Sequence, residues 1–281
     1  MLQVNKRFRS MEEVLHDLRQ KVNERQANSI NQLQSETTST STSETSYECS
    51  ICKDTGFVWE KVKTGLFYKN VEQVVEQARR CECYKRKNIM RLFRNSHITE
   101  EFRKLGFNNF TIEGKPAPIQ DAFKKAVLYF KSFHRLREDR TNSIALLGNP
   151  GTGKTHLLSA VANNLMKSQI PVLYFPYREG FDELKDRLED LESKVERMKD
   201  IDVLFIDDLF KRSATEFEIK TLYSVINYRY LNHKPILISS ECLVDDLLDI
   251  DEALGSRIYQ MCKQYLVEIV GDRRQLNHRL A

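Results

Sequence analysis

Near its middle the chain reads Gly148-Asn149-Pro150-Gly151-Thr152-Gly153-Lys154-Thr155. This stretch fits the pattern G-x-x-x-x-G-K-[ST], and it lies between the apolar run SIALL at 143–147 and the helix-forming run THLLSAVANNLM. Glycine lets the backbone wrap closely around an anion, and a helix that starts there points its amide hydrogens at the same place. The stretch therefore predicts a phosphate-binding loop between a buried strand and a helix.

The side chains of this loop indicate which phosphate-bearing ligand it takes. Lys154 is expected to pair with the β and γ phosphates of ATP, and Thr155 is expected to place its hydroxyl on Mg²⁺. We expect His156, the next residue, to contact the nucleotide together with the rest of the loop. The flanking strand and helix argue against the alternative, which is a chance match in a glycine-rich turn.

A second part of a nucleotide site is predicted further along the chain. The apolar run at 203–206 is followed directly by Asp207 and Asp208. A buried strand that ends in two carboxylates places the first near Mg²⁺ and the second near the γ-phosphate, where it can orient or deprotonate the attacking water. Two aspartates after a strand also suit a turn or a helix cap, and the preceding phosphate loop favours the nucleotide site.

The segments around these motifs alternate between apolar runs and amphipathic stretches. Continuous apolar runs predict buried strands of a parallel sheet, and apolar residues at every third or fourth position predict the helices that cover it. The expected strands are 143–147, 171–176, 201–206, 235–239 and 265–269. The expected helices are 119–138, 154–167, 181–199, 215–232 and others within 243–263. The predicted fold class is α/β, with a parallel sheet flanked by helices.

One of these helices has an apolar stripe with heptad spacing. The stripe consists of Leu184, Leu188, Leu191, Val195 and Met198. It covers barely two heptads, so packing against the sheet is favoured over a coiled coil.

The sequence before residue 106 is organised differently. Residues 1–34 have helical periodicity, and residues 35–47 are mostly serine and threonine, which predicts a flexible linker. Residues 48–105 contain the strand-like pieces FVWEKV and LFY and then a basic helical stretch. We therefore predict an N-terminal helical segment, a linker, a small cysteine-bearing module and an ATPase domain over 106–281.

Cysteines occur as a C-x₂-C pair and a C-x-C pair within the small module. They are Cys49, Cys52, Cys81 and Cys83. Four thiolates suit tetrahedral zinc in a structural role, and a small module gains folding free energy from the metal. Disulfides are disfavoured in a reducing cytoplasm, and a redox C-x-x-C normally follows a strand rather than a linker. The isolated Cys242 and Cys262 are expected to be buried apolar residues.

Charge and hydropathy limit the partners only partly. Lysine plus arginine exceeds aspartate plus glutamate by 44 to 40, and the net charge of +4 neither demands nor excludes nucleic acid. Nine basic residues gather between 79 and 104, a cluster that suits phosphates or an acidic partner and equally a solvated helix face. Because no apolar run is long enough for a membrane span and the N-terminus lacks an apolar signal segment, we expect a cytoplasmic protein without a membrane partner.

Four stretches of the chain resemble a known family. GNPGTGKTHL, VLFIDDLF, INYRYLNHKPILISS and GSRI are similar to the DnaC/DnaI-type bacterial helicase loaders and the related IstB-type ATPases of the AAA+ superfamily. The resemblance runs from about residue 99 to the C-terminus, and CSICKDTGF with CECYK resembles the zinc-binding part of DnaI-type loaders. It implies that Arg257 of GSRI is an arginine finger for an adjacent subunit. It also implies self-association and contact with single-stranded DNA through the ATPase domain, and binding of a replicative DnaB-type helicase through the N-terminal module.

Two departures from the family pattern bear on the site. Where the family usually has a serine and then an asparagine, this chain has Ser240 and Glu241 after the strand 235–239. Either Ser240 takes the polar role at the γ-phosphate or the attacking water is positioned less firmly. Only 12 residues follow Ile269, so we expect no full C-terminal helical lid, with Arg273 or Arg274 in place of a lid arginine.

The expected function is ATP-dependent helicase loading at the initiation of replication. Three alternatives stay open at this point. An IstB-like transposition helper would lack the cysteine module, and a P-loop kinase would need a small-molecule phosphoryl acceptor but no Arg257 from a second subunit. An ATP-binding adaptor would show little turnover.

Overall fold

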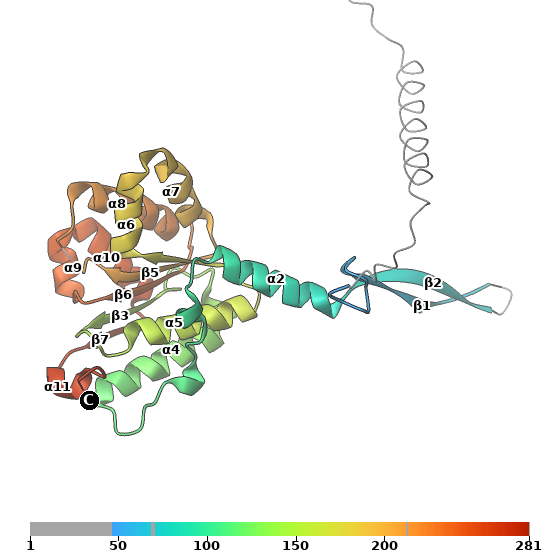
Figure 1. Ribbon diagram of the computed structural model, residues 1–281, viewed down its shortest axis with the longest axis horizontal. Coiled ribbons are helices and arrows are strands. Elements are labelled where there is room, and N and C mark those ends of the chain that lie inside the picture. Colours follow the sequence, from blue (N-terminus) through green and yellow to red (C-terminus); the bar gives the residue numbers. More distant parts are fainter. Residues whose placement is uncertain (1–46, 69–70, 212, 281) are drawn as a thin grey trace, which may run out of the picture. The chain divides into compact units, whose positions relative to one another are not determined.

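The computed structural model describes residues 47–68, 71–211 and 213–280 (Figure 1). The helical segment predicted over 1–34, and the linker up to residue 46, lie outside these described residues. Among the helices that are described, none combines the length and the apolar character that crossing a membrane requires.

Five parallel strands form the central sheet in the order β4-β5-β6-β3-β7. Their bounds are β3 Ile144–Gly148, β4 Val172–Pro176, β5 Val203–Leu209, β6 Ile236–Ser240 and β7 Leu266–Ile269. The predicted parallel α/β fold is confirmed. Because β6 lies between β3 and β5, the carboxyl ends of these three strands meet at one edge of the sheet, which is where ligands bind in folds of this type.

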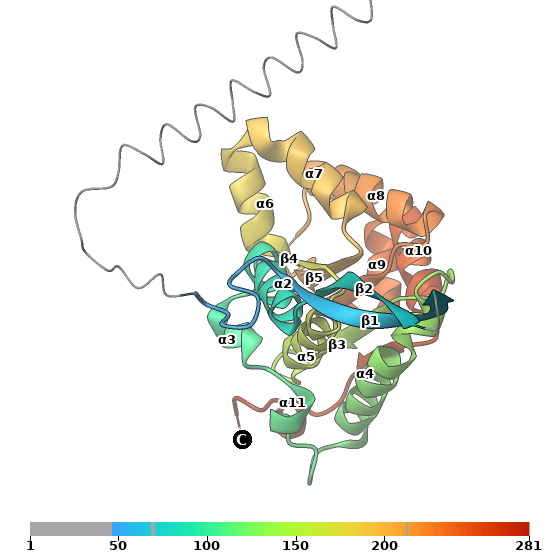
Figure 2. The ribbon, with the colours of Figure 1, turned by 90° about the vertical axis from the view of Figure 1, so that its right-hand side faces the viewer.

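Helices cover both faces of this sheet (Figures 1 and 2). One face packs against α4 and α5, and the other packs against α6 to α10. The bounds are α4 Ala117–Leu136, α5 Lys154–Lys167, α6 Tyr177–Asp186, α7 Leu191–Asp200, α8 Glu216–Leu231, α9 Val244–Ile250 and α10 Glu252–Cys262. Of the residues described after β7, only Arg273–Leu276 form a helix, α11, so a full helical lid is absent from this part of the chain.

The single helix predicted over 181–199 is wrong, because two helices occupy this stretch. Arg187 has φ −133° and ψ 69°, which ends α6, and a short 3₁₀ turn leads into α7. Leu184 and Met198 are buried in the cluster below α6 and α7, whereas Leu188 is 62% exposed. The break interrupts the heptad stripe, and the rest of it packs toward the sheet as expected.

The described residues before the sheet contain a two-stranded antiparallel sheet and a helix. The strands are β1 Phe57–Tyr68 and β2 Val71–Arg80, and the basic stretch forms α2 Glu82–Asn95. β2 was not expected, because its sequence VEQVVEQARR is rich in residues that favour helices.

The segment between α2 and α4 packs on the ATPase core. It includes the short helix α3 Glu100–Arg103, and Ile98 is buried in the same cluster as α5. The side-chain amide of Asn163, on α5, donates to the carbonyls of Phe102 and Leu105, at 2.8 Å in both cases. These bonds hold residues 102–105 against α5, the helix that follows the phosphate loop.

Candidate functional site

The phosphate loop joins β3 to α5 through two glycines in left-handed conformations. Gly151 has φ +72° and Gly153 has φ +87°, values that side chains disfavour. A Cβ at Gly151 would lie 2.0 Å from Asn277 Oδ1, and one at Gly153 would lie 2.5 Å from the Phe110 ring. Both positions therefore require glycine for conformation and for space.

Lys154 begins α5 and is 5% exposed. Its ammonium donates to the carbonyls of Gly148 and Asn149, at 2.8 Å in each case. Burial lowers the pKa of Lys154 to about 8, and the nearby Glu241 and Asp208 carboxylates oppose this shift. The loop thus keeps a buried cation at its centre, in the position that the motif predicts for binding phosphates.

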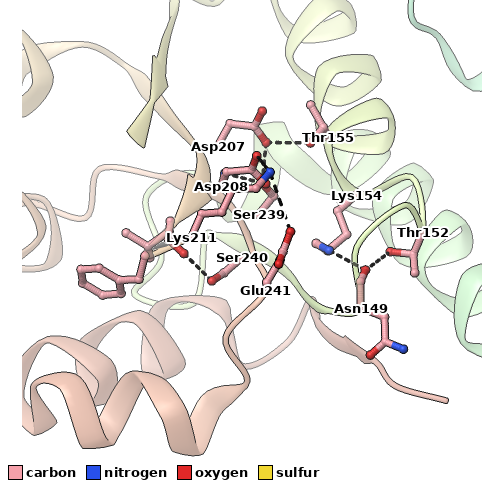
Figure 3. Close-up of polar contacts among 12 residues, drawn as sticks. Asn149, Thr152, Lys154, Thr155, Asp207, Asp208, Lys211, Ser239, Ser240 and Glu241 are labelled. Carbon is pink, nitrogen blue, oxygen red and sulfur yellow. Dashed lines mark hydrogen bonds and ion pairs between the residues drawn. The ribbon is translucent and has the colours of Figure 1, made fainter. Parts of the chain in front are cut away.

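Asp207 lies near the end of β5 and is held by three hydroxyl groups, of which Figure 3 labels those of Thr155 and Ser239. The Thr155 hydroxyl donates to Asp207 Oδ1 at 2.9 Å, the Tyr174 hydroxyl donates to Oδ2 at 3.0 Å, and Ser239 also donates to Oδ1. Burial raises the pKa of this carboxyl, whereas the hydrogen bonds lower it. A hydroxyl and a carboxylate in contact form the pair of oxygen ligands that Mg²⁺ takes in such sites.

Asp208 faces the pocket because β5 is irregular at this point. The pairing of β5 with β6 shifts register between Ile206 and Leu209, and Asp208 has φ +55°. Its carboxylate pairs with Lys211 at 2.6 Å, and the Lys211 ammonium lies 3.7 Å from Glu241. Lys211 was not expected from the sequence, since no motif marks a lysine after this strand.

Ser240, which was expected to face the γ-phosphate, is turned away from the pocket. Its hydroxyl is buried, donates to the Leu209 carbonyl at 2.6 Å and accepts from the Cys242 amide at 3.0 Å. These bonds fix the end of β6 beside the end of β5. The polar side chain that this strand end gives to the pocket is Glu241.

These elements enclose a pocket of about 740 Å³. The phosphate loop and the strand ends form part of its wall, and the segment 102–115 forms another part. His156 lines it too, and its Nε2 donates to the Gly106 carbonyl at 3.1 Å while its ring packs edge-on against Phe110. The volume, the glycine cradle, the lysine and the Mg²⁺-type ligands fit ATP with its metal.

Some residues that were expected to contact the nucleotide do not line the pocket. Gly148 and Asn149 do not line it, and the Asn149 amide donates to the Ile269 carbonyl at 2.9 Å. Arg273 and Arg274 of α11 do not line it either, whereas His278 and Arg279 do. The His278 amide donates to the Gly151 carbonyl at 2.9 Å, so the residues after α11 return to the phosphate loop.

Arg257 lies on α10 and does not line the pocket. Its Nε donates to the Asn227 side chain at 3.0 Å, and its Nη1 donates to the Ala253 carbonyl at 2.7 Å. The guanidinium carbon lies 5.2 Å from the Tyr223 ring centre and 5.6 Å from that of Tyr230. The side chain is half-buried and rests on α8.

The structure brings together the cysteines expected to bind zinc. The sulfur atoms of Cys49, Cys52, Cys81 and Cys83 all lie within 4.8 Å of one another. This arrangement is compatible with a four-thiolate zinc site.

The two isolated cysteines differ in burial. Cys262 is fully buried, as expected, whereas Cys242 is only half-buried because it follows the end of β6 at the surface.

Residues 86–262 match the family described as the bacterial DnaA ATPase domain. The chain belongs to this family of AAA+ ATPase domains. Two relatives come from Bacillus subtilis (strain 168). YqaM is 56% identical over 209 residues, which cover 72% of this chain and 67% of YqaM. The phage-like element PBSX protein XkdC is 49% identical over 240 residues, which cover 83% of this chain and 86% of XkdC.

Solved structures show the same fold. DnaI has a TM-score of 0.54 at 23% identity, with 62% of this chain and 95% of that chain covered. DnaA bound to AMPPCP and single-stranded DNA has a TM-score of 0.50 at 25% identity, with 61% of this chain and 51% of that chain covered. The resemblance to DnaI-type AAA+ proteins is thereby confirmed for the fold.

Proposed function

We propose that this protein is an ATP-dependent loader that binds a replicative DnaB-type helicase and helps to place it on single-stranded DNA. Its membership of the DnaA ATPase domain family and the fold shared with DnaI support this role. The observation that supports this proposal most directly is the position of Arg257. It lies outside a pocket that contains a buried lysine, Mg²⁺-type ligands and a carboxylate. An arginine placed in this way suits the pocket of a second subunit.

In this proposal each residue of the pocket has a separate task. The loop amides and Lys154 bind the phosphates, and Thr155 and Asp207 hold Mg²⁺. The metal neutralises charge on the phosphates when it is bound. Asp208 orients or deprotonates the attacking water, and Arg257 of a neighbouring subunit stabilises the charge that develops on the γ-phosphate.

A loading assay tests the partner. The helicase of the host is supplied with circular single-stranded DNA coated by single-strand-binding protein, and unwinding of an annealed oligonucleotide is measured with and without this protein and ATP. We expect unwinding only with both. A variant that begins at residue 81 keeps α2 and the core, and it is expected to lose helicase binding while retaining ATP binding. Unwinding that is indifferent to the protein would contradict the loader assignment.

We propose that Cys49, Cys52, Cys81 and Cys83 hold one structural Zn²⁺, and metal analysis of the purified protein tests this. Elemental analysis is expected to find about one zinc per chain, lost in Cys52→Ser and retained in the matched control Cys242→Ser. Because the cysteines are not part of the pocket, the Cys52→Ser variant is expected to bind ADP normally. Full zinc content in Cys52→Ser would contradict the assignment.

An adaptor that binds ATP but turns it over slowly is a second candidate, favoured by Glu241 at the edge of the pocket. A carboxylate near the γ-phosphate repels it, where the neutral asparagine of related proteins does not. Turnover in the presence of single-stranded DNA and helicase separates this candidate from the loader.

A further inference from the structure

The two carboxylates at the strand ends pose an electrostatic problem for ATP binding. Asp208 and Glu241 face the same pocket as Asp207, and a third phosphate would add negative charge beside them. Lys154, which binds the phosphates in the proposed function, donates to carbonyls of its own loop and contacts neither Asp208 nor Glu241. Lys115 and Arg279 also line the pocket, but Lys211 is the cation that contacts these carboxylates, since its ammonium lies 2.6 Å from Asp208 and 3.7 Å from Glu241.

The backbone places Lys211 in this position through an energetically unfavourable conformation of the residue before it. The Lys211 amide donates to the Asp208 carbonyl at 3.1 Å, which closes a tight turn, and Phe210 inside the turn has φ +55°. A left-handed conformation is unfavourable for a bulky residue, and it persists where packing enforces it. Phe210 is 4% exposed and packs edge-on against Tyr177, so the core stabilises the turn that returns Lys211 to the pocket.

We propose that Lys211 is a γ-phosphate-sensing residue of the subunit's own site: it holds Asp208 and Glu241 before ATP binds, and then pairs with the third phosphate, which leaves the Asp208 carboxylate accessible to the attacking water. Figure 3 shows Lys211 reaching from the end of β5 toward both carboxylates. The Asp208 bond raises the pKa of Lys211, so the ammonium stays charged. The inference rests on the proposed ATPase function and adds to it the group that distinguishes ATP from ADP.

Equilibrium binding of ADP and of AMPPCP, each with Mg²⁺, to the full chain tests the inference. Lys211→Ala is expected to weaken AMPPCP binding about tenfold or more, which is the usual effect of losing one charge-assisted hydrogen bond, and to change ADP binding less than about twofold. The unchanged ADP affinity also shows that the variant is folded. Lys211→Arg is expected to restore the preference for AMPPCP.

Lys220 provides a matched control. It pairs with Glu216 at 2.6 Å on the exposed side of α8 and does not line the pocket, so Lys220→Ala is expected to bind both nucleotides normally. An unchanged ratio of AMPPCP to ADP affinity in Lys211→Ala overturns the inference. Failure of the unsubstituted protein to bind either nucleotide would instead overturn the proposed function.

Glu241→Gln tests the role of the second carboxylate. Removing its charge is expected to strengthen AMPPCP binding relative to ADP, and to restore part of the loss when combined with Lys211→Ala. If Glu241→Gln instead weakens AMPPCP binding, Glu241 contributes directly to nucleotide binding, and the charge-balancing role of Lys211 is wrong.

Discussion

Two arginines on neighbouring helices of the ATPase domain are used in opposite ways. Arg229 of α8 is fully buried, and its two terminal nitrogens donate to five backbone carbonyls. These carbonyls belong to Met198, Lys199, Ile201, Asp202 and Pro235. Arg257 of α10 donates to one side chain and one carbonyl, and the rest of its guanidinium lies on tyrosine rings.

The difference indicates a structural role for Arg229 and a binding role for Arg257. The donors of Arg229 join the end of α7 to the residues before β5 and β6. The hydrogen bonds of its guanidinium therefore stabilise the fold. Arg257 is held in place without being saturated, and a guanidinium with unused donors is suited to bind a phosphate. Substitutions at three positions test this contrast.

The largest effect is expected for Arg257→Ala. If Arg257 serves as the finger, ATP turnover falls about 10³-fold, as for other arginine fingers. Because Arg257 does not line the pocket of its own chain, ADP affinity is expected to stay unchanged. The midpoint of urea unfolding is expected to fall only slightly, since the side chain is half-buried and makes two hydrogen bonds. Steady-state phosphate release and urea titration measure the two quantities. Loss of folding together with turnover would place Arg257 in the same class as Arg229.

A large effect on stability is expected for Arg229→Met. The methionine fills much of the space but leaves five buried carbonyls without their donor, at a cost of about 4 kcal/mol in the free energy of unfolding. Arg273→Met, on the exposed face of α11, is the control and is expected to change stability by less than about 0.5 kcal/mol. Urea unfolding followed by circular dichroism compares them. Equal stability of both variants would show that the Arg229 hydrogen bonds contribute little.

The smallest effect is expected at Tyr223, whose ring supports Arg257. Tyr223→Phe keeps the ring face and is expected to have normal turnover. Tyr223→Leu keeps apolar bulk but loses a cation–π contact of about 1 kcal/mol, which corresponds to about a fivefold decrease in turnover. If both variants behave alike, the ring does not position Arg257.

Sequence patterns predicted the parts of the site that depend on local backbone and on strand ends. The loop 148–155 and the pair Asp207 and Asp208 carry their chemistry in consecutive residues, so the motifs alone predicted where they would lie. The unbroken helix over 181–199 was wrong because its periodicity contains no signal for the turn at Arg187.

Residues that depend on long-range contacts were missed. Lys211 reaches the pocket only because the register shift and the turn at Phe210 direct it back, and Arg229 becomes structural only when carbonyls from α7 and β6 converge on it. Ser240 was expected to face the nucleotide, but pairing of β5 with β6 leaves its hydroxyl bonded to Leu209. The contacts of Arg229 with Met198 and of Ser240 with Leu209 each join residues about 30 positions apart, and the local turn that carries Lys211 follows the irregular pairing of β5 with β6.

Turnover of mixed variants tests most directly whether ATP is hydrolysed between subunits. Arg257→Ala keeps its pocket, and Lys154→Ala lacks the phosphate-binding lysine but keeps its arginine, so each is expected to be inactive alone. Mixed with single-stranded DNA and ATP, they are expected to regain turnover, because Arg257 of one variant completes the pocket of the other. Normal hydrolysis by Arg257→Ala alone would contradict an intersubunit site.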